Sequence, residues 1–90
     1  MTITMHVPTI LRSLTKNNKT IATSGYSVLD AIEQVEQQYP GIKERLIFEN
    51  EVHRFMNIYV NDNDIRFSDN LATPLKDGDI ITILPAVAGG

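Results

Sequence analysis

The chain has 90 residues, which is enough for one domain with a single modest core. Its formal net charge of -3 and its scattered basic residues argue against nucleic-acid binding, and the absence of cysteine excludes disulfides, thiolate metal sites and catalysis by a thiol. No apolar run is long enough to span a membrane, and the first residues lack the basic and then apolar segments of a secretory signal, so we expect a cytoplasmic protein.

The N-terminal third predicts two strands. Apolar Ile3, Met5 and Val7 alternate with polar neighbours, which is typical of a half-buried strand that ends near Pro8. Residues 9–18 follow as a loop, and residues 19–23 form a second, weaker strand that Ser24-Gly25 breaks.

The middle of the chain predicts one main helix. Ser27 is a good N-cap, and Asp30 stands three residues later as the return arm of a capping box. Pro40-Gly41 ends the helix, and residues 42–47 add a short helical turn with Ile42, Leu46 and Ile47 as apolar contacts. The apolar face of the main helix consists of Val28, Leu29, Ile32, Val35 and Tyr39.

The second half predicts a charged surface loop at residues 49–54 and a third strand at residues 55–60, with Met56, Ile58 and Val60 on one face. Residues 61–64 turn the chain into a brief fourth strand at residues 65–67. Leu71 and Leu75 then fill the core from an irregular segment, and Asp77-Gly78-Asp79 is a turn.

The last strand, residues 80–84, is apolar at four of its five positions, which indicates a central strand covered on both faces. Pro85 cannot donate to a sheet and marks its end. Residues 86–90 have too little apolar surface to offset the entropy of ordering. We therefore predict a folded domain over residues 1–85 and a flexible diglycine tail over residues 86–90.

These elements predict an α+β fold, in which one main helix packs on a mixed sheet of four to five strands. A buried final strand is most simply placed beside the first and parallel to it, with the helix in a right-handed crossover. That arrangement is the ubiquitin-like β-grasp.

No catalytic or metal site is predicted within the domain. His6 and His53 are isolated, and none of the serines has a histidine in a nucleophile context. Asp62 and Asp64 resemble the start of a calcium loop, but the positions that need glycine and glutamate hold Phe67 and Thr73. A hairpin turn is the better interpretation of that segment.

The diglycine end admits two interpretations. Gly89 and Gly90 lack Cβ atoms, so the tail could enter a narrow catalytic tunnel in another protein. Frayed termini also favour glycine, so the two residues alone do not decide between a functional and an inert end.

A family resemblance adds to this interpretation. Residues 53–62, 64–68, 71–73 and 77–90 resemble the MoaD/ThiS family of ubiquitin-like sulfur carriers, and especially its members that serve cysteine synthesis. Residues 7–12 and 39–46 fit as well, so the likeness spans nearly the whole chain. The loop at residues 49–52 is shorter than that pattern.

The resemblance implies a carrier and not an enzyme. A ubiquitin-activating-like enzyme uses ATP and magnesium to adenylate the terminal residue, here Gly90, and a sulfur donor then displaces AMP to leave a thiocarboxylate. Ala86, Val87, Ala88 and Gly89 form the tail that enters partner active sites. The implied partners are that adenylyltransferase, a pyridoxal-phosphate cysteine synthase acting on O-phosphoserine, and a zinc metallopeptidase that releases cysteine.

The cofactors implied by the resemblance belong to those partners, and the carrier itself binds none. Three alternatives stay open from the sequence. The sulfur could go to molybdopterin or to the thiamine thiazole, the chain could be a ubiquitin-like protein modifier, or the tail could be inert.

Overall fold

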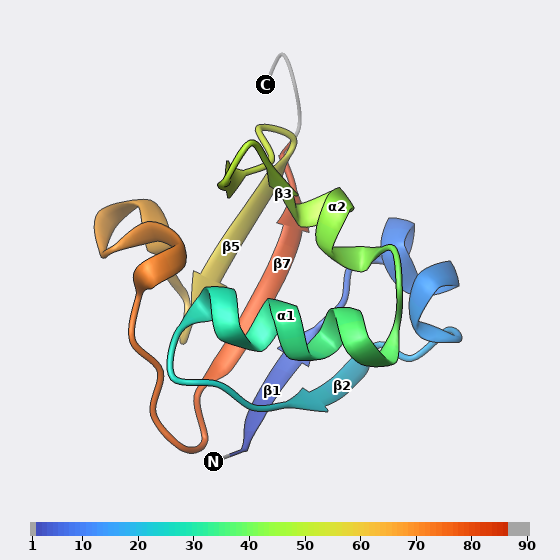
Figure 1. Cartoon of the computed structure of the whole chain (residues 1–90), viewed down its shortest axis with the longest axis horizontal. Coiled ribbons are helices and arrows are strands. Elements are labelled where there is room, and N and C mark those ends of the chain that lie inside the picture. The colour runs from blue at the N-terminus through green and yellow to red at the C-terminus, as the bar shows by residue number, and fades with distance from the viewer. Residues whose placement is uncertain (1, 87–90) are drawn as a thin grey trace.

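The computed structural model describes residues 2–86 and places them in a five-stranded mixed sheet with α1 (Val28–Gln38) across one face (Figure 1). The strand order is β2-β1-β7-β5-β6. β1 and β7 run parallel, and the other neighbours are antiparallel. The strands are β1 (Ile3–His6), β2 (Thr20–Thr23), β5 (Met56–Val60), β6 (Asn63–Asp64) and β7 (Ile80–Pro85). This is the predicted β-grasp, with the last strand central and parallel to the first.

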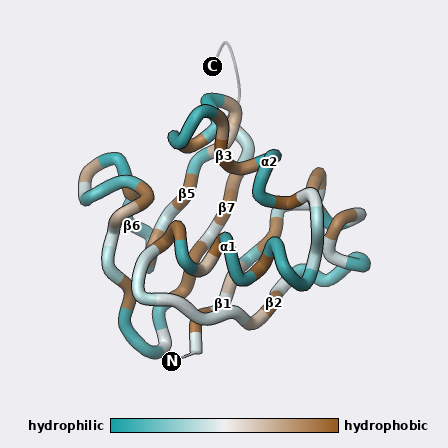
Figure 2. Tube along the Cα trace, in the orientation of Figure 1, coloured by the Kyte–Doolittle hydropathy of each residue, from teal (hydrophilic) through white to brown (hydrophobic). Residues whose placement is uncertain are grey.

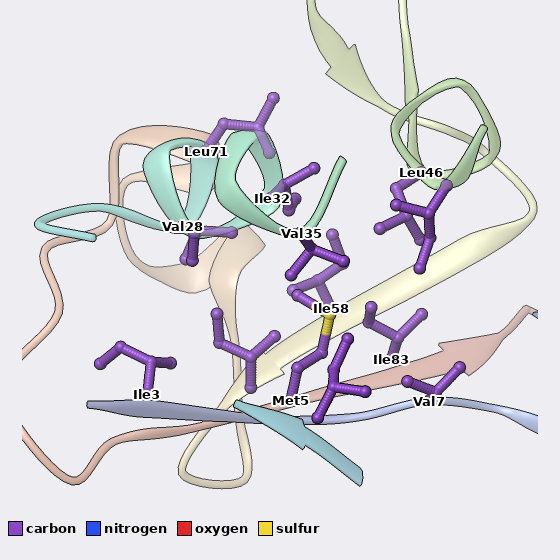
Figure 3. Close-up of a cluster of buried hydrophobic side chains, with 14 of the residues drawn as sticks. Ile3, Met5, Val7, Val28, Ile32, Val35, Leu46, Ile58, Leu71 and Ile83 are labelled. Carbon is purple, nitrogen blue, oxygen red and sulfur yellow. The ribbon is translucent and has the colours of Figure 1, made fainter. Parts of the chain in front are cut away.

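One hydrophobic core lies between the sheet and the helices (Figure 3). The strands supply Ile3, Met5, Ile58 and Ile83, the α-helices Val28, Ile32, Val35 and Leu46, a 3-10 helix Leu71, and the segment after β1 Val7. Each of these side chains is at most 9% exposed. Leu75 is buried as well, so the two leucines predicted to fill the core do so.

The predicted loop at residues 9–18 is wrong over its first part, which forms the 3-10 helix η1 (Thr9–Thr15). Pro8 precedes this helix with φ -69°, and the side chain of its residue Leu11 is buried. The Thr15 hydroxyl donates to the carbonyl oxygens of Arg12 and Asn18, which closes the segment on itself. A 3-10 helix of this length has too few turns to produce a clear apolar period.

The N-terminal cap of α1 is confirmed. The Ser27 hydroxyl accepts a hydrogen bond from the Asp30 backbone N–H at 3.2 Å, while the Asp30 carboxylate accepts from the N–H of Tyr26, one residue earlier than a capping box requires. The apolar face is shifted from the prediction, because Ala31 is fully buried and Leu29 is 37% exposed. Figure 2 shows how hydrophobic and hydrophilic positions alternate along this helix.

A carboxylate joins α1 to the short helix α2 (Ile42–Leu46). Gly41, with φ 104°, makes the turn between them. The Glu36 carboxylate accepts hydrogen bonds from the backbone N–H groups of Lys43 at 2.9 Å and of Gly41 at 3.1 Å. These bonds stabilise the charged form and hold the pKa of Glu36 below its ordinary value.

The predicted loop at residues 49–54 is also wrong in part, because Glu51–Val52 is the strand β4, which pairs with β3 (Ile47–Phe48) just before the segment to form a hairpin. Its two turn residues are left-handed, Glu49 with φ 52° and Asn50 with φ 66°. This geometry suits a two-residue hairpin, but such turns usually carry glycine. Because neither Glu49 nor Asn50 is a glycine, the sequence predicts an ordinary loop here.

The fourth strand is displaced from its prediction. Asn61 and Asp62 are also a left-handed pair, β6 follows at once, and Ile65–Phe67 is the 3-10 helix η2 and not a strand. Asp64 caps η2 by accepting from the Arg66 N–H at 2.9 Å and also pairs with its guanidinium at 2.7 Å. Arg66 thereby holds the pKa of Asp64 below its ordinary value. A further 3-10 helix, η3 (Asn70–Ala72), carries Leu71 into the core.

The expectation that β7 is covered on both faces is wrong. Ile81 and Ile83 are buried, whereas Ile80 is 39% and Leu84 is 46% exposed. Successive side chains of a strand point to opposite faces, and α1 covers only one of them (Figure 1). Within residues 2–86, the apolar side chains on the other face of β7 therefore stay partly exposed.

A substitution in β7 tests this one-sided burial. We expect Ile83→Asp to destabilise the domain by about 4 kcal/mol or more, because an unpaired charge enters the core. That loss rivals the whole stability of a domain of this size, about 5–13 kcal/mol. The neighbouring change Leu84→Asp is the matched control and should cost about 1 kcal/mol. Urea unfolding followed by circular dichroism measures both, and equal losses would contradict the assignment of faces.

A second prediction concerns the link between α1 and α2. Replacing Glu36 with Gln removes the charge that the two backbone N–H groups stabilise, so the thermal midpoint should fall at neutral pH. Because the folded pKa of Glu36 is lowered, its contribution is present above the ordinary carboxyl value of 4.5 and is lost as the pH falls below it. The gap between wild type and E36Q should therefore narrow toward about pH 3.

The control for this experiment is Glu33→Gln. Glu33 forms a salt bridge with the Lys43 side chain, whereas Glu36 accepts from the backbone N–H groups of Gly41 and Lys43. If E33Q lowers the midpoint as much as E36Q does, general charge and not the backbone bonds would explain the effect.

Candidate functional site

The candidate site is the C-terminal end of the chain. The predicted attachment residue Gly90 and the tail residues Val87, Ala88 and Gly89 lie outside the described residues. The structure does describe the place where the chain leaves the sheet. Pro85 is paired with Met56 at the end of β7, and the Ala86 N–H donates a 2.8 Å hydrogen bond to the Phe55 carbonyl oxygen.

The start of β7 is held by side-chain hydrogen bonds. The Asn61 side chain donates to the Asp79 carboxylate at 2.8 Å and accepts from the Ile80 N–H at 3.0 Å. The same carboxylate accepts from the Lys76 N–H at 2.8 Å, across the turn that contains Gly78 at φ 89°. The strand therefore enters and leaves the sheet at fixed points, which sets where the last residues begin.

A cluster of aromatic and basic side chains lies beside this exit, where the Phe55 carbonyl is bonded to Ala86; we call Phe48, His53, Arg54 and Phe55 the exit patch. Phe48 is 61% and Phe55 is 46% exposed. The His53 ring lies between the two phenylalanines, with centroids 6.2 Å and 5.5 Å away, and the Arg54 guanidinium carbon is 4.8 Å from the centre of the Phe55 ring. The sequence interpretation missed this cluster, although two phenylalanines in a charged segment were a usable signal.

The other candidates considered from the sequence do not come together. His6 is exposed on β1, His53 belongs to the exit patch, and Asp64 is engaged by Arg66. Within residues 2–86, no three histidine, aspartate or glutamate side chains are placed to hold a metal ion. Within the same residues, no helix is long and apolar enough to cross a bilayer.

Known proteins resemble the chain over its whole length. It is 50% identical over 93 residues to "Sulfur carrier protein CysO" of Mycobacterium tuberculosis, with all of both chains covered. It superposes with a TM-score of 0.93 on a chain of the crystal structure of the Amycolatopsis orientalis BexX/CysO complex, at 52% identity and covering 98% of this chain and 99% of that one. "Small archaeal modifier protein 3" of Haloferax volcanii is 38% identical over 64 residues, 71% of this chain and 70% of the relative.

The family comparison includes the C-terminal end. The ThiS family matches residues 5–90, which contain the whole sheet apart from the first residues of β1, the exit patch and the terminal diglycine. The matched residues thus include both the fold and the candidate site, and the chain belongs to the ThiS family.

Proposed function

We propose that this protein is a sulfur carrier whose reactive group is a thiocarboxylate on Gly90. One observation carries the proposal. The chain is 50% identical over its full length to a named sulfur carrier, and its last two residues, Gly89 and Gly90, come shortly after the end of the central strand β7. The domain contributes a rigid base, and partner enzymes supply the catalysis.

The chemistry follows from the weakness of a carboxylate as an acyl donor. Its leaving group would be an oxide anion, so the Gly90 carboxylate first attacks the α-phosphorus of ATP, which forms an acyl-adenylate and releases pyrophosphate. Hydrosulfide, or a persulfide with a reductant, then displaces AMP and leaves the carbon–sulfur bond of the thiocarboxylate. ATP and magnesium belong to the activating enzyme.

The geometry suits delivery into another protein. Gly90 is the fourth residue after Ala86, so the two residues lie at most roughly 14 Å apart when the chain is extended. Small residues at the end, Ala88-Gly89-Gly90, fit passages that larger side chains would block. The carrier therefore needs to dock closely before its end reaches a catalytic centre.

The recipient we propose is cysteine synthesis from O-phosphoserine. A pyridoxal-phosphate enzyme would eliminate phosphate to give an aminoacrylate, and the thiocarboxylate sulfur would add to it. An acyl shift from sulfur to nitrogen gives an amide-linked cysteine. A zinc peptidase would then hydrolyse that amide, which releases cysteine and restores the Gly90 carboxylate.

A second candidate is protein modification, and the likeness to the small archaeal modifier protein favours it specifically. In that case the same adenylate would be attacked by a lysine amine of a target, which forms an isopeptide bond at Gly90. Both functions share the activation step and differ in the nucleophile that follows.

Intact-mass analysis separates the candidates. After incubation with ATP, magnesium, the activating enzyme and sulfide, a carrier should gain the mass difference between sulfur and oxygen at its C-terminus. A modifier would instead appear attached to other proteins. An unchanged mass with active enzyme present would refute the carrier function.

Deleting Gly90 should abolish this loading while the thermal midpoint stays nearly unchanged. The shortened chain loses roughly 3.5 Å of reach, and a displacement of that size moves the carboxylate away from the nucleotide. Every buried side chain named above lies within residues 3–83, so stability should not depend on the terminal residue. A large drop in the midpoint of the deletion variant would show that the end is part of the packed domain.

A further inference from the structure

We propose that the exit patch is the surface by which the activating enzyme recognises this carrier; this inference rests on the proposed function. The occupant would be an apolar side chain of the enzyme, packed on the exposed faces of the Phe48 and Phe55 rings, with an enzyme carboxylate facing the Arg54 guanidinium. The first support is exposure. Two phenylalanines this open contribute little to the core, and clustered exposed apolar groups mark interaction sites.

Distance is the second support. The Ala86 N–H is bonded to the Phe55 carbonyl at 2.8 Å, so the exit patch is attached to the last described residue. Only four residues follow, which limits the separation between Ala86 and the reacting carbon to roughly 14 Å. An enzyme that encloses Gly90 must therefore cover the surface around Phe55.

The patch is also preformed. The His53 N–H donates to the Leu46 carbonyl at 2.7 Å, and its ring nitrogen Nδ1 accepts from the Phe55 N–H at 3.1 Å. A depression of about 420 Å³ lies here, lined by the exit patch together with Glu49, Glu51 and Val52 of the β3–β4 hairpin. Because these bonds hold the His53 ring and the Phe55 backbone before binding, less ordering entropy opposes the docking of a partner.

Charge supports an acidic contact at Arg54. Its guanidinium lies over the Phe55 ring, and within residues 2–86 no carboxylate forms a salt bridge with it. An arginine held over an aromatic ring keeps its N–H edges available for a carboxylate, and such arginines are frequent anchors of interfaces.

Specificity explains why the activating enzyme would use this surface. The last four residues, Val87-Ala88-Gly89-Gly90, offer small side chains that distinguish this chain poorly from other diglycine ends. Discrimination therefore has to come from folded surface within reach of the end. The activating enzyme handles the carrier first, before any recipient, and so has the greatest need to select it.

The test is ATP–pyrophosphate exchange by the activating adenylyltransferase of the source organism, with the full-length carrier as the varied substrate. Phe48→Ala and Arg54→Glu should each raise the KM for the carrier about tenfold, with kcat within about twofold of wild type. Phe67→Ala is the matched control, because Phe67 is 89% exposed on η2, outside the exit patch, and it should leave KM within about twofold.

Each result below supports or refutes docking of the activating enzyme at the exit patch. If wild type supports exchange and both patch variants behave like F67A, docking at the exit patch is refuted while the proposed function stands. If wild type supports no exchange, the proposed function fails and takes this inference with it. If F48A proves unfolded by circular dichroism, R54E decides, since Arg54 is exposed. A rise in KM confined to the recipient enzyme would also overturn the assignment to the activating enzyme.

Discussion

The structure depends on the position of β7 between β1 and β5. Its register with β5 runs from Val60↔Ile81 to Met56↔Pro85, and its parallel register with β1 joins the two ends of the chain. Ile81 and Ile83 bury this strand against the same core that holds α1. Because two neighbours and the core constrain β7 together, the point at which the chain leaves the sheet is fixed by the fold as a whole.

One layer of helix covers the sheet, and this explains the uneven exposure of an almost wholly apolar strand. α1 shields the face that carries Ile83, and the opposite face keeps Ile80 and Leu84 partly open. A domain of this size has a limited apolar supply, so a second covering layer would need more chain than the described residues provide. The open face is thus a consequence of size as much as of sequence.

The sequence predicted the elements whose signals are long or repeated. Ser27 and the spacing of Val28, Ile32 and Val35 were sufficient for α1, and the alternation at residues 3–7 was sufficient for β1. The errors fall in short elements, which are the 3-10 helices η1 and η2 and the β3–β4 hairpin, whose left-handed turn at Glu49-Asn50 contains no glycine to indicate it. The cover of β7 was misjudged because an apolar run cannot show how many layers surround it. Gly90 was selected from the end of the chain and from family resemblance, whereas the exit patch required the spatial relation of Phe55 to Ala86.

Phe55 contributes both to the sheet of the domain and to the surface proposed for partner docking. Its carbonyl extends the sheet by one hydrogen bond to Ala86, and its ring stands half exposed beside His53 and Arg54. Elsewhere the two roles are separate, since the core ends at Ile83 while the proposed reacting carbon lies at residue 90. This separation lets the surface near the exit change to suit a partner without loss of packing. It also restricts such changes to a small area, because only surface within reach of four residues can be covered when the end of the chain is engaged.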